Sequence, residues 1–321
     1  ILRLTPRHNE NVNSYWMCDH GRLNSFKFVS AENRIHYPQI RKDGELVEVG
    51  WDEAFSEAVS RLKTFPKDQI AIIGSAFATC EDSFLTAKFA KNVLNTGNLD
   101  FIRHNNPDFA DDILRTQDLT QNSNGAILTG VVPSQAGLNI KGILKGIKEQ
   151  RIKALYLIED DVVKKYPELE SAIAKLDLLI VHSSNLDQST NYADIVFPAS
   201  TFAEKNGTFL NGSGMLQRIR PAVATSELDR ALDGMNMSRL DKFGTKFDSW
   251  ASGKKIEARP TWKILVSLSK ALGFKMKYTM AEEIFNDMTD SINEFKDLDY
   301  DVVGESGIQI EIKKNNTVKT G

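Results

Sequence analysis

The residues with the most distinctive chemistry are the two cysteines, Cys18 and Cys80. A thiolate is both a nucleophile and a metal ligand, and its reactivity depends on its pKa and exposure. Cys80 follows Thr79 at the expected start of a helix, where the helix N-terminus could lower the pKa of the thiol. The alternative is a buried, inert thiol, and we favour that interpretation. Two cysteines do not make a disulfide framework, so we expect a reducing compartment.

Cys18 lies in the segment NVNSYWMCDHGRL (residues 11–23), in a Cys-x-x-Gly-Arg pattern close to the N-terminus. This setting is similar to that of the last ligand of an iron–sulfur cluster whose other cysteines would lie upstream. His20, two residues further on, is the one histidine we expect beside such a cluster. The sequence begins at Ile1, within an expected strand over residues 1–5. We therefore expect a piece of a longer protein, cut between the first cluster ligands and the last.

Other polar groups give no catalytic constellation. The histidines show neither metal-ligand spacing nor a Ser-His-Asp pattern; they are His8, His20, His36, His104 and His182. The acidic run at residues 159–161 would repel a pyrophosphate, and we interpret it as a solvated turn that caps a helix. Glu204 and Lys205 could contact a ligand or form a structural ion pair, and we favour the ion pair. We assign no acid, base or nucleophile.

The elements that must position these residues alternate between buried strands and amphipathic helices. Apolar runs of strand length at residues 69–76, 153–159, 176–183 and 193–199 are separated by helical segments at 79–94, 140–149 and 167–175. This order predicts an α/β fold with doubly wound parallel-sheet layers. Gly74, at the end of the first run, is weak evidence for a phosphate-binding turn.

We expect the chain to divide into four parts. Residues 1–50 would be a β-rich remnant of a cluster-binding domain, with a turn at residues 42–44. Residues 51–115 and 116–225 would be a first and a second α/β layer. Residues 226–321 would be irregular and helical, with helices near 260–272 and 280–295.

Charge and hydropathy exclude some classes of function. The net charge of −3 gives no support to nucleic-acid binding, which needs a basic face. No apolar run reaches the roughly 18 residues of a membrane-spanning helix, so we expect no direct membrane insertion. Any work at a membrane would depend on protein partners.

Two long motifs resemble the molybdopterin oxidoreductase family. VNSYWMCDHGR (residues 12–22) is similar to the family's Val-Asn-x-x-x-x-Cys-x-Lys-Gly-Arg pattern, which closes a [4Fe–4S] motif. ADIVFPASTFAEKNGTFLNGSGMLQR (residues 193–218) is similar to its Ala-Asp-x-Val-Leu-Pro segment and the Glu-x-x-Gly-Thr that follows. Within the family, the opening and the segment 258–274 resemble most the branch formed by the large iron–sulfur subunit of bacterial respiratory complex I, NADH:quinone oxidoreductase.

The resemblance implies that Cys18 matches the fourth cluster ligand. A [4Fe–4S] cluster needs four thiolates, so this chain cannot hold it alone. Three departures from the family pattern imply that molybdopterin is absent. His20 replaces a lysine that links cluster and pterin, residues 101–107 carry no Cys or Ser metal ligand, and the acidic run 159–161 lies near the expected pterin nucleotides. The span 110–125 also looks short, as if a catalytic insert were missing.

Three functions follow from this resemblance. The first is a scaffold within a complex I peripheral-arm subunit, with the other subunits as partners, at the cytoplasmic face of the inner membrane. The second is a molybdenum or tungsten bis-pterin oxidoreductase, such as a formate dehydrogenase. The third is a non-redox interaction module that keeps only the fold. Hydrogenase-linked diaphorase subunits and assimilatory nitrate reductases are further relatives that we considered.

Overall fold

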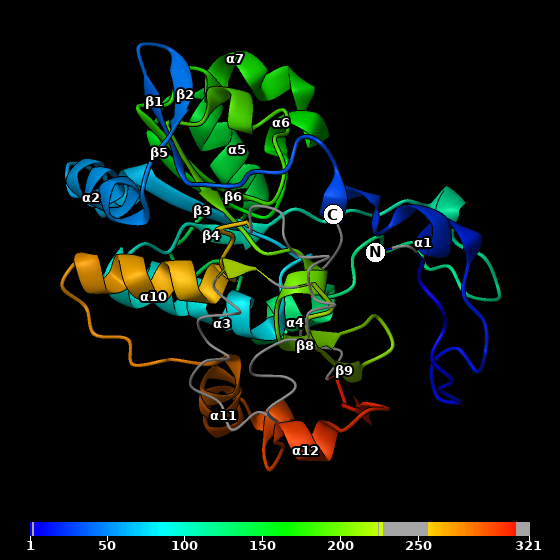
Figure 1. Ribbon diagram of the computed structural model, residues 1–321. Coiled ribbons are helices and arrows are strands. Elements are labelled where there is room, and N and C mark those ends of the chain that lie inside the picture. Colours follow the sequence, from blue (N-terminus) through cyan, green and yellow to red (C-terminus); the bar gives the residue numbers. More distant parts are fainter. Residues whose placement is uncertain (2, 224, 227–255, 313–321) are drawn as a thin grey trace, which may run out of the picture.

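The computed structural model describes residues 1, 3–223, 225–226 and 256–312. Its main sheet has seven strands in the order β2-β1-β7-β6-β5-β3-β4 (Figure 1). The strands are β1 (Gln39–Lys42), β2 (Glu45–Glu48), β3 (Ile70–Gly74), β4 (Leu99–Phe101), β5 (Ala154–Ile158), β6 (Leu178–Ser183) and β7 (Ile195–Pro198). β3 to β7 run parallel to one another, whereas β1 pairs antiparallel with both β7 and β2.

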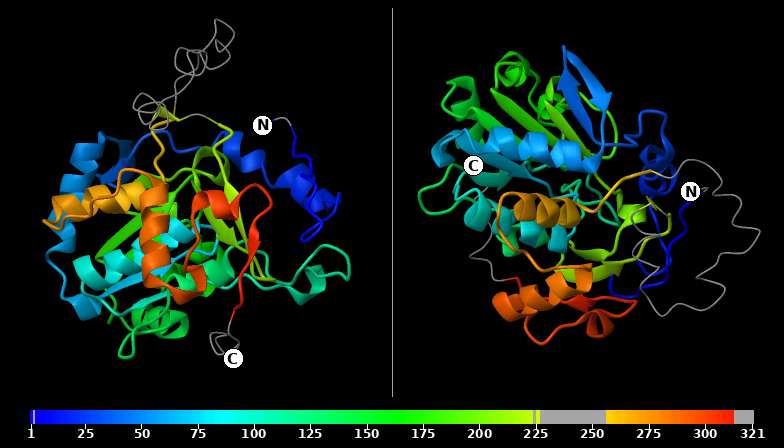
Figure 2. Two further views of the ribbon diagram at one scale, coloured as in Figure 1. Left: turned by 90° about the horizontal axis from the view of Figure 1, so that it is seen from below. Right: turned by 60° about the vertical axis from the view of Figure 1, so that its left-hand side comes forward.

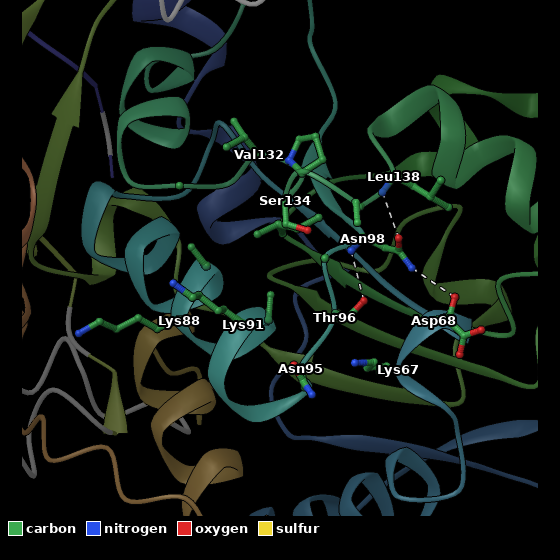
Figure 3. Close-up of a pocket in the computed structure, with 18 of the residues that line it drawn as sticks. Lys67, Asp68, Lys88, Lys91, Asn95, Thr96, Asn98, Val132, Ser134 and Leu138 are labelled. Atoms are coloured by element: carbon green, nitrogen blue, oxygen red, sulfur yellow. Dashed lines mark hydrogen bonds between the residues drawn. The ribbon is translucent and has the colours of Figure 1, made fainter.

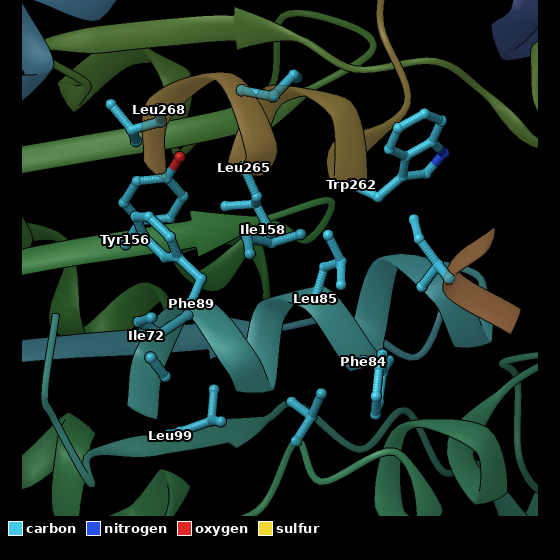
Figure 4. Packing of buried hydrophobic residues seen from close by; sticks show 14 of the residues in the cluster. Ile72, Phe84, Leu85, Phe89, Leu99, Tyr156, Ile158, Trp262, Leu265 and Leu268 are labelled. Carbon is cyan, nitrogen blue, oxygen red and sulfur yellow. The ribbon is translucent and has the colours of Figure 1, made fainter. Parts of the chain in front are cut away.

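Alternate residues of the central strands pack into two separate hydrophobic cores. Ile72 and Tyr156 belong to one core, whereas Ile73 and Leu157 belong to the other. The first core is covered by α2 (Trp51–Leu62), α3 (Cys80–Lys88) and α10 (Thr261–Ala271), and the second by α5 (Ile140–Lys148), α6 (Val162–Lys165) and α7 (Glu170–Ile173). Figure 4 shows α3 and α10 packed in the first core. Helices on both faces explain why these strands are apolar throughout.

A second, three-stranded sheet extends the molecule beyond α3. It has the order β10-β9-β8, formed by β8 (Gly207–Leu210), β9 (Met215–Ile219) and β10 (Ile308–Gln309). The helices beside it are α4 (Ser123–Leu128), α11 (Ala281–Ser291) and α12 (Tyr300–Val303). Figure 2 places α11 and α12 on the opposite side of the molecule from α5, α6 and α7. The helices expected near 260–272 and 280–295 are therefore present.

Short turns of helix complete the described chain. They are the 3-10 turns at Lys27–Ser30, Lys67–Gln69, Pro107–Phe109, Pro167–Leu169, Thr190–Tyr192, Phe202–Glu204 and Asn293–Phe295, and a π-helical turn at Phe89–Val93 that continues α3. Thr79 caps α3 as expected, with its side chain accepting from the Asp82 amide.

The N-terminal part differs from the expectation in two ways. The expected strand over residues 1–5 does not form. Residues 1 and 3–5, which the structure describes, pair with no other strand. The β-rich remnant is reduced to the β1–β2 hairpin, which joins the main sheet. Its turn lies at Asp43 and Gly44, whose φ angles of 51° and 89° suit a tight hairpin turn. A short helix, α1 (Asp19–Asn24), follows Cys18.

The doubly wound α/β class is confirmed, but strands from both expected layers share one sheet. β3, before residue 116, pairs directly with β5, after it. The expected domain boundaries stay predictions, and much of the looser segment 226–255 lies outside the described residues. No helix in the described ranges is long and apolar enough to cross a membrane.

Candidate functional site

The carboxyl ends of the parallel strands define the candidate site. Ligands of open α/β sheets bind at this edge, because the loops that follow the strands gather there. The N-terminal segment also runs along it. Ile35 donates its amide to the Ser184 carbonyl, 3.0 Å away, and the Asn185 side chain donates to the Phe28 carbonyl. The structure therefore brings the cysteine-bearing segment and the strand-end loops to the same side.

Lys205 is the centre of this edge. Its ammonium group is buried and donates to Asp82 Oδ2 at 2.8 Å and to both carboxylate oxygens of Glu159 at 2.9 and 3.0 Å. Burial lowers the pKa of Lys205, but the charges of the two carboxylates more than offset this and hold it above its usual value. Lys205 is thus a structural cation, as favoured, but its partners are Asp82 and Glu159 and not Glu204.

A chain of hydrogen bonds leads from this cluster into the first core. The Thr261 hydroxyl donates to Glu159 Oε1 at 2.7 Å, so its oxygen is free to accept from His182 Nδ1 at 3.2 Å. His182 Nε2 then accepts from the Tyr156 hydroxyl at 2.7 Å. Burial lowers the pKa of His182 to about 3, which keeps the ring neutral with its proton on Nδ1. This chain anchors the start of α10 to β5 and β6.

The acidic run 159–161 is mostly buried. Glu159 binds Lys205, and Asp160 lies 3.0 Å from His104 Nε2. Asp161 accepts from the Lys164 amide and from the Ser189 hydroxyl, and so caps α6. The predicted cap is confirmed, but the predicted solvation is wrong for Glu159 and Asp160. Basic partners from distant segments, which local sequence does not reveal, cover these two carboxylates.

A second buried ion pair joins Arg34 to Glu204. Arg34 Nη2 lies 2.9 Å from both carboxylate oxygens, and both side chains are almost inaccessible to solvent. Glu204 also accepts from the Thr201 amide, which fixes the turn after β7. The sequence predicted an ion pair for Glu204 but did not single out Arg34.

Cys18 lies half-buried at the start of α1. Its sulfur accepts from the Gly21 amide at 3.4 Å. The His20 ring packs edge-on against Phe109, with ring centroids 5.1 Å apart, so it contacts the loop after β4. Within the described residues, no group of three or more His, Cys, Asp or Glu side chains could hold a metal ion. Cys18 is therefore not part of such a group in this part of the chain, and its role as a cluster ligand stays a prediction.

Cys80 is fully buried, as we favoured. Burial and the charge of Glu81 raise the pKa of its thiol. Its sulfur lies 3.2 Å from Asn122 Oδ1. Gly207 lies close to the same helix, α3. A Cβ at this position would lie 2.7 Å from the side chains of Glu81 and Thr79. The absence of a side chain at Gly207 is thus required by this packing.

The loop after β3 is engaged within the protein itself. The Ser75 hydroxyl donates to the Glu159 carbonyl at 2.8 Å and accepts from the Phe77 amide at 3.0 Å. Open α/β sheets of this class hold ligands in the loops that follow the carboxyl ends of the strands. Here, buried ion pairs occupy much of that edge.

Comparison with known proteins identifies the family. The family model described as molybdopterin oxidoreductase matches residues 34–128 and 115–230, more than half of the chain. The chain belongs to the molybdopterin oxidoreductase family. The two matched segments meet within the span where the sequence suggested a missing insert.

The curated relatives are oxidoreductases. The NADPH-Fe(3+) oxidoreductase subunit alpha of Geobacter sulfurreducens is 41% identical over 98 residues, 30% of this chain and 12% of that protein. F420-dependent formate dehydrogenase 1 subunit alpha of Methanococcus maripaludis is 39% identical over 100 residues, 31% of this chain and 15% of that protein. The matches thus span only a small part of these relatives.

A solved structure supports the fold alone. Acetylene hydratase from Pelobacter acetylenicus superposes with a TM-score of 0.59 at 9% identity, covering 95% of this chain and 70% of that one.

The loop after β4 is where the resemblance leads us to expect a metal ligand. The expected ligand is a Cys, selenocysteine or Ser, and residues 102–107 contain none of these. His104, in that segment, is held by Asp160. We therefore derive no chemical step through that cofactor.

Proposed function

We propose that this chain is the molybdopterin-type domain of an iron–sulfur oxidoreductase that receives electrons from a pyridine nucleotide. In this proposal the domain is mainly a scaffold and partner surface, without molybdopterin. The observation that carries it is the occupied strand edge, where Lys205 binds Asp82 and Glu159. The relative named NADPH-Fe(3+) oxidoreductase subunit alpha supports a pyridine nucleotide as the electron donor.

The large iron–sulfur subunit of bacterial respiratory complex I is the more specific form of the proposal. It would place the protein with the other peripheral-arm subunits at the cytoplasmic face of the inner membrane, with Cys18 as one ligand of a [4Fe–4S] cluster. The relatives reported above are named for iron reduction or formate oxidation, not for quinone reduction. This specific form therefore depends on the sequence motifs alone.

A formate dehydrogenase of the molybdenum type is the second candidate. Relatives from Methanococcus maripaludis that are 37% and 39% identical over about a third of the chain favour it, and more strongly than they favour complex I. The missing metal ligand after β4 and the buried carboxylates count against it.

Metal analysis of the full-length parent, purified without oxygen, separates these candidates. We expect iron at cluster stoichiometry and neither molybdenum nor tungsten. The Cys18→Ala variant should lose the electron paramagnetic resonance signal of one cluster, whereas Cys80→Ala, a matched control with a buried thiol, should keep it. Stoichiometric molybdenum or tungsten would overturn the proposal in favour of a formate dehydrogenase. A protein without metal would overturn it in favour of the non-redox interaction module.

A further inference from the structure

A groove lies at the end of the sheet opposite the strand-end site. It has a volume of about 1230 Å³ and runs along the amino ends of β3 and β4, between the π-helical turn after α3 and the loop 129–138 (Figure 3). A smaller hollow of about 340 Å³ beside residues 274–278 adjoins it at Lys88. We call these two hollows together the basic groove.

The walls of the basic groove hold uncommon backbone conformations. Residues 89–93 form a π-helical turn, a feature that occurs frequently at functional sites. Asn95 and Gln150, which line the groove, have φ angles of 51° and 56°. Such angles cost free energy in non-glycine residues and persist only where the surrounding structure enforces them. The shape of this surface is therefore fixed by the fold.

The charge of the groove contrasts with that of the chain. Its lining includes six cationic side chains, namely Lys67, Lys88, Lys91, Arg151, Lys275 and Lys277, against the single carboxylate of Asp68. Lys88 and Arg151 are paired with Asp287 and Glu149. The other four lysines are exposed and make no ion pair among the described residues. The whole chain, by contrast, carries a net charge of −3.

Apolar surface lies between these cations. Val132 and Leu138, both half-buried, line the larger hollow, and Phe274, 45% exposed, borders the smaller one. A ligand that fits must therefore combine negative charge with apolar groups.

Two polar side chains of the groove floor already bind other parts of the protein. The Thr96 hydroxyl donates to the Ile70 carbonyl, and the Asn98 side chain accepts from the Leu138 amide. Small-molecule sites use a few convergent polar groups to orient the ligand, and the Thr96 hydroxyl proton and the Asn98 side-chain oxygen are already engaged. A concave surface also suits an inserted segment better than the flat surface of a membrane.

We propose that the basic groove binds an acidic segment of a partner protein, with apolar side chains against the floor and carboxylates against the four unpaired lysines. Charge complementarity of this kind steers association and selects the partner. This inference goes beyond the proposed function and does not depend on whether the parent holds iron or molybdenum.

The test measures binding of two labelled synthetic peptides to the full-length protein by fluorescence anisotropy. One peptide alternates Glu with Leu and Phe, and the other replaces every Glu by Lys. We expect only the acidic peptide to bind, and more weakly as salt rises. Lys67→Glu combined with Lys91→Glu should weaken binding about tenfold, and Lys275→Glu combined with Lys277→Glu similarly.

Two further variants separate docking from general charge effects. Lys164→Glu combined with Lys165→Glu makes the same charge change on α6, at the opposite end of the sheet, and should leave affinity within about twofold. Ala136→Trp fills the groove without changing its charge and should weaken binding.

Three results would overturn the proposal. These are no binding of the acidic peptide, an equal loss in the α6 variant, or full binding by Ala136→Trp. If the protein bound phosphatidylserine vesicles but not the acidic peptide, and Lys67→Glu with Lys91→Glu weakened that binding, the groove would instead be a membrane-facing surface.

Discussion

At the scale of single residues, Glu81 is a fully buried carboxyl whose charge state affects stability. It is fully buried between α3, β8 and α12, and accepts from the Thr208 amide at 2.8 Å and the Tyr300 hydroxyl at 2.9 Å. Burial raises the pKa of Glu81 to about 7, although these donors oppose the rise. The carboxyl therefore changes its protonation near neutral pH inside the folded protein.

This pKa predicts a pH-dependent stability that Glu81→Gln removes. Because the folded pKa exceeds the unfolded one, the native state binds the proton more tightly, and the free energy of unfolding falls as pH rises from about 4.5 to about 7. The shift corresponds to roughly 3 kcal/mol. Urea unfolding between pH 4.5 and 8 should show a flatter profile for Glu81→Gln than for the wild type.

The control for this prediction is Glu48→Gln, which changes an exposed carboxyl at the end of β2. It should reproduce the wild-type pH profile. A Glu81→Gln profile parallel to that of the wild type would show that Glu81 does not cause the dependence.

At the scale of elements, the loop 134–138 packs unusually closely against the start of β4. A Cβ added to Gly137 would lie 1.8 Å from the Gly97 carbonyl oxygen, which belongs to the backbone and cannot rotate away. Gly137→Ala should therefore push the loop off β4 and destabilise the fold by about 1–3 kcal/mol. Urea unfolding measures this change directly.

Gly212→Ala is the matched control, because a Cβ at Gly212 meets nothing within 4 Å. Its free energy of unfolding should stay within about 0.5 kcal/mol of the wild type. If both substitutions lowered the free energy of unfolding equally, the cause would be the replacement of glycine and not the contact with β4.

Local patterns predicted the elements well but not their long-range pairing. The apolar runs at β3, β5, β6 and β7 and the cap at Thr79 are visible in the sequence, because strand period and cap chemistry act over a few residues. The pairing of β3 with β5 has no such signal, so the number of sheets was not predictable. Periodicity likewise does not show the π-helical turn that ends α3.

The same limit applies to the candidate site. Sequence motifs identified Cys18, Glu204 and Lys205, because each lies in a continuous pattern. The partners of the last two, Arg34 and Asp82, lie 170 and 123 residues away. The basic groove is similarly assembled from separate segments, so no single stretch of sequence predicts it.

At the scale of the whole molecule, both halves of the chain depend on one another. β3 pairs with β4 on one side and with β5 on the other, so β3 and β4 form one edge of the sheet. Later strands complete the sheet beside them. The first core likewise joins Phe89 of the early part to Tyr156 and Leu268 of the later parts (Figure 4). The first core therefore needs residues from both parts, whereas most of the second core comes from residues after 116.

This mutual dependence predicts the behaviour of a chain divided at the expected boundary. A fragment of residues 1–115 leaves the β5 edge of β3 unpaired and the apolar face of α3 exposed, so it should lack native far-ultraviolet circular dichroism and aggregate. Coexpression with residues 116–321 should restore a soluble complex, because the pairing of β3 with β5 needs no covalent link. A fragment 1–115 that folds alone would establish residues up to 115 as an independent unit and contradict the dependence of the first core on both parts.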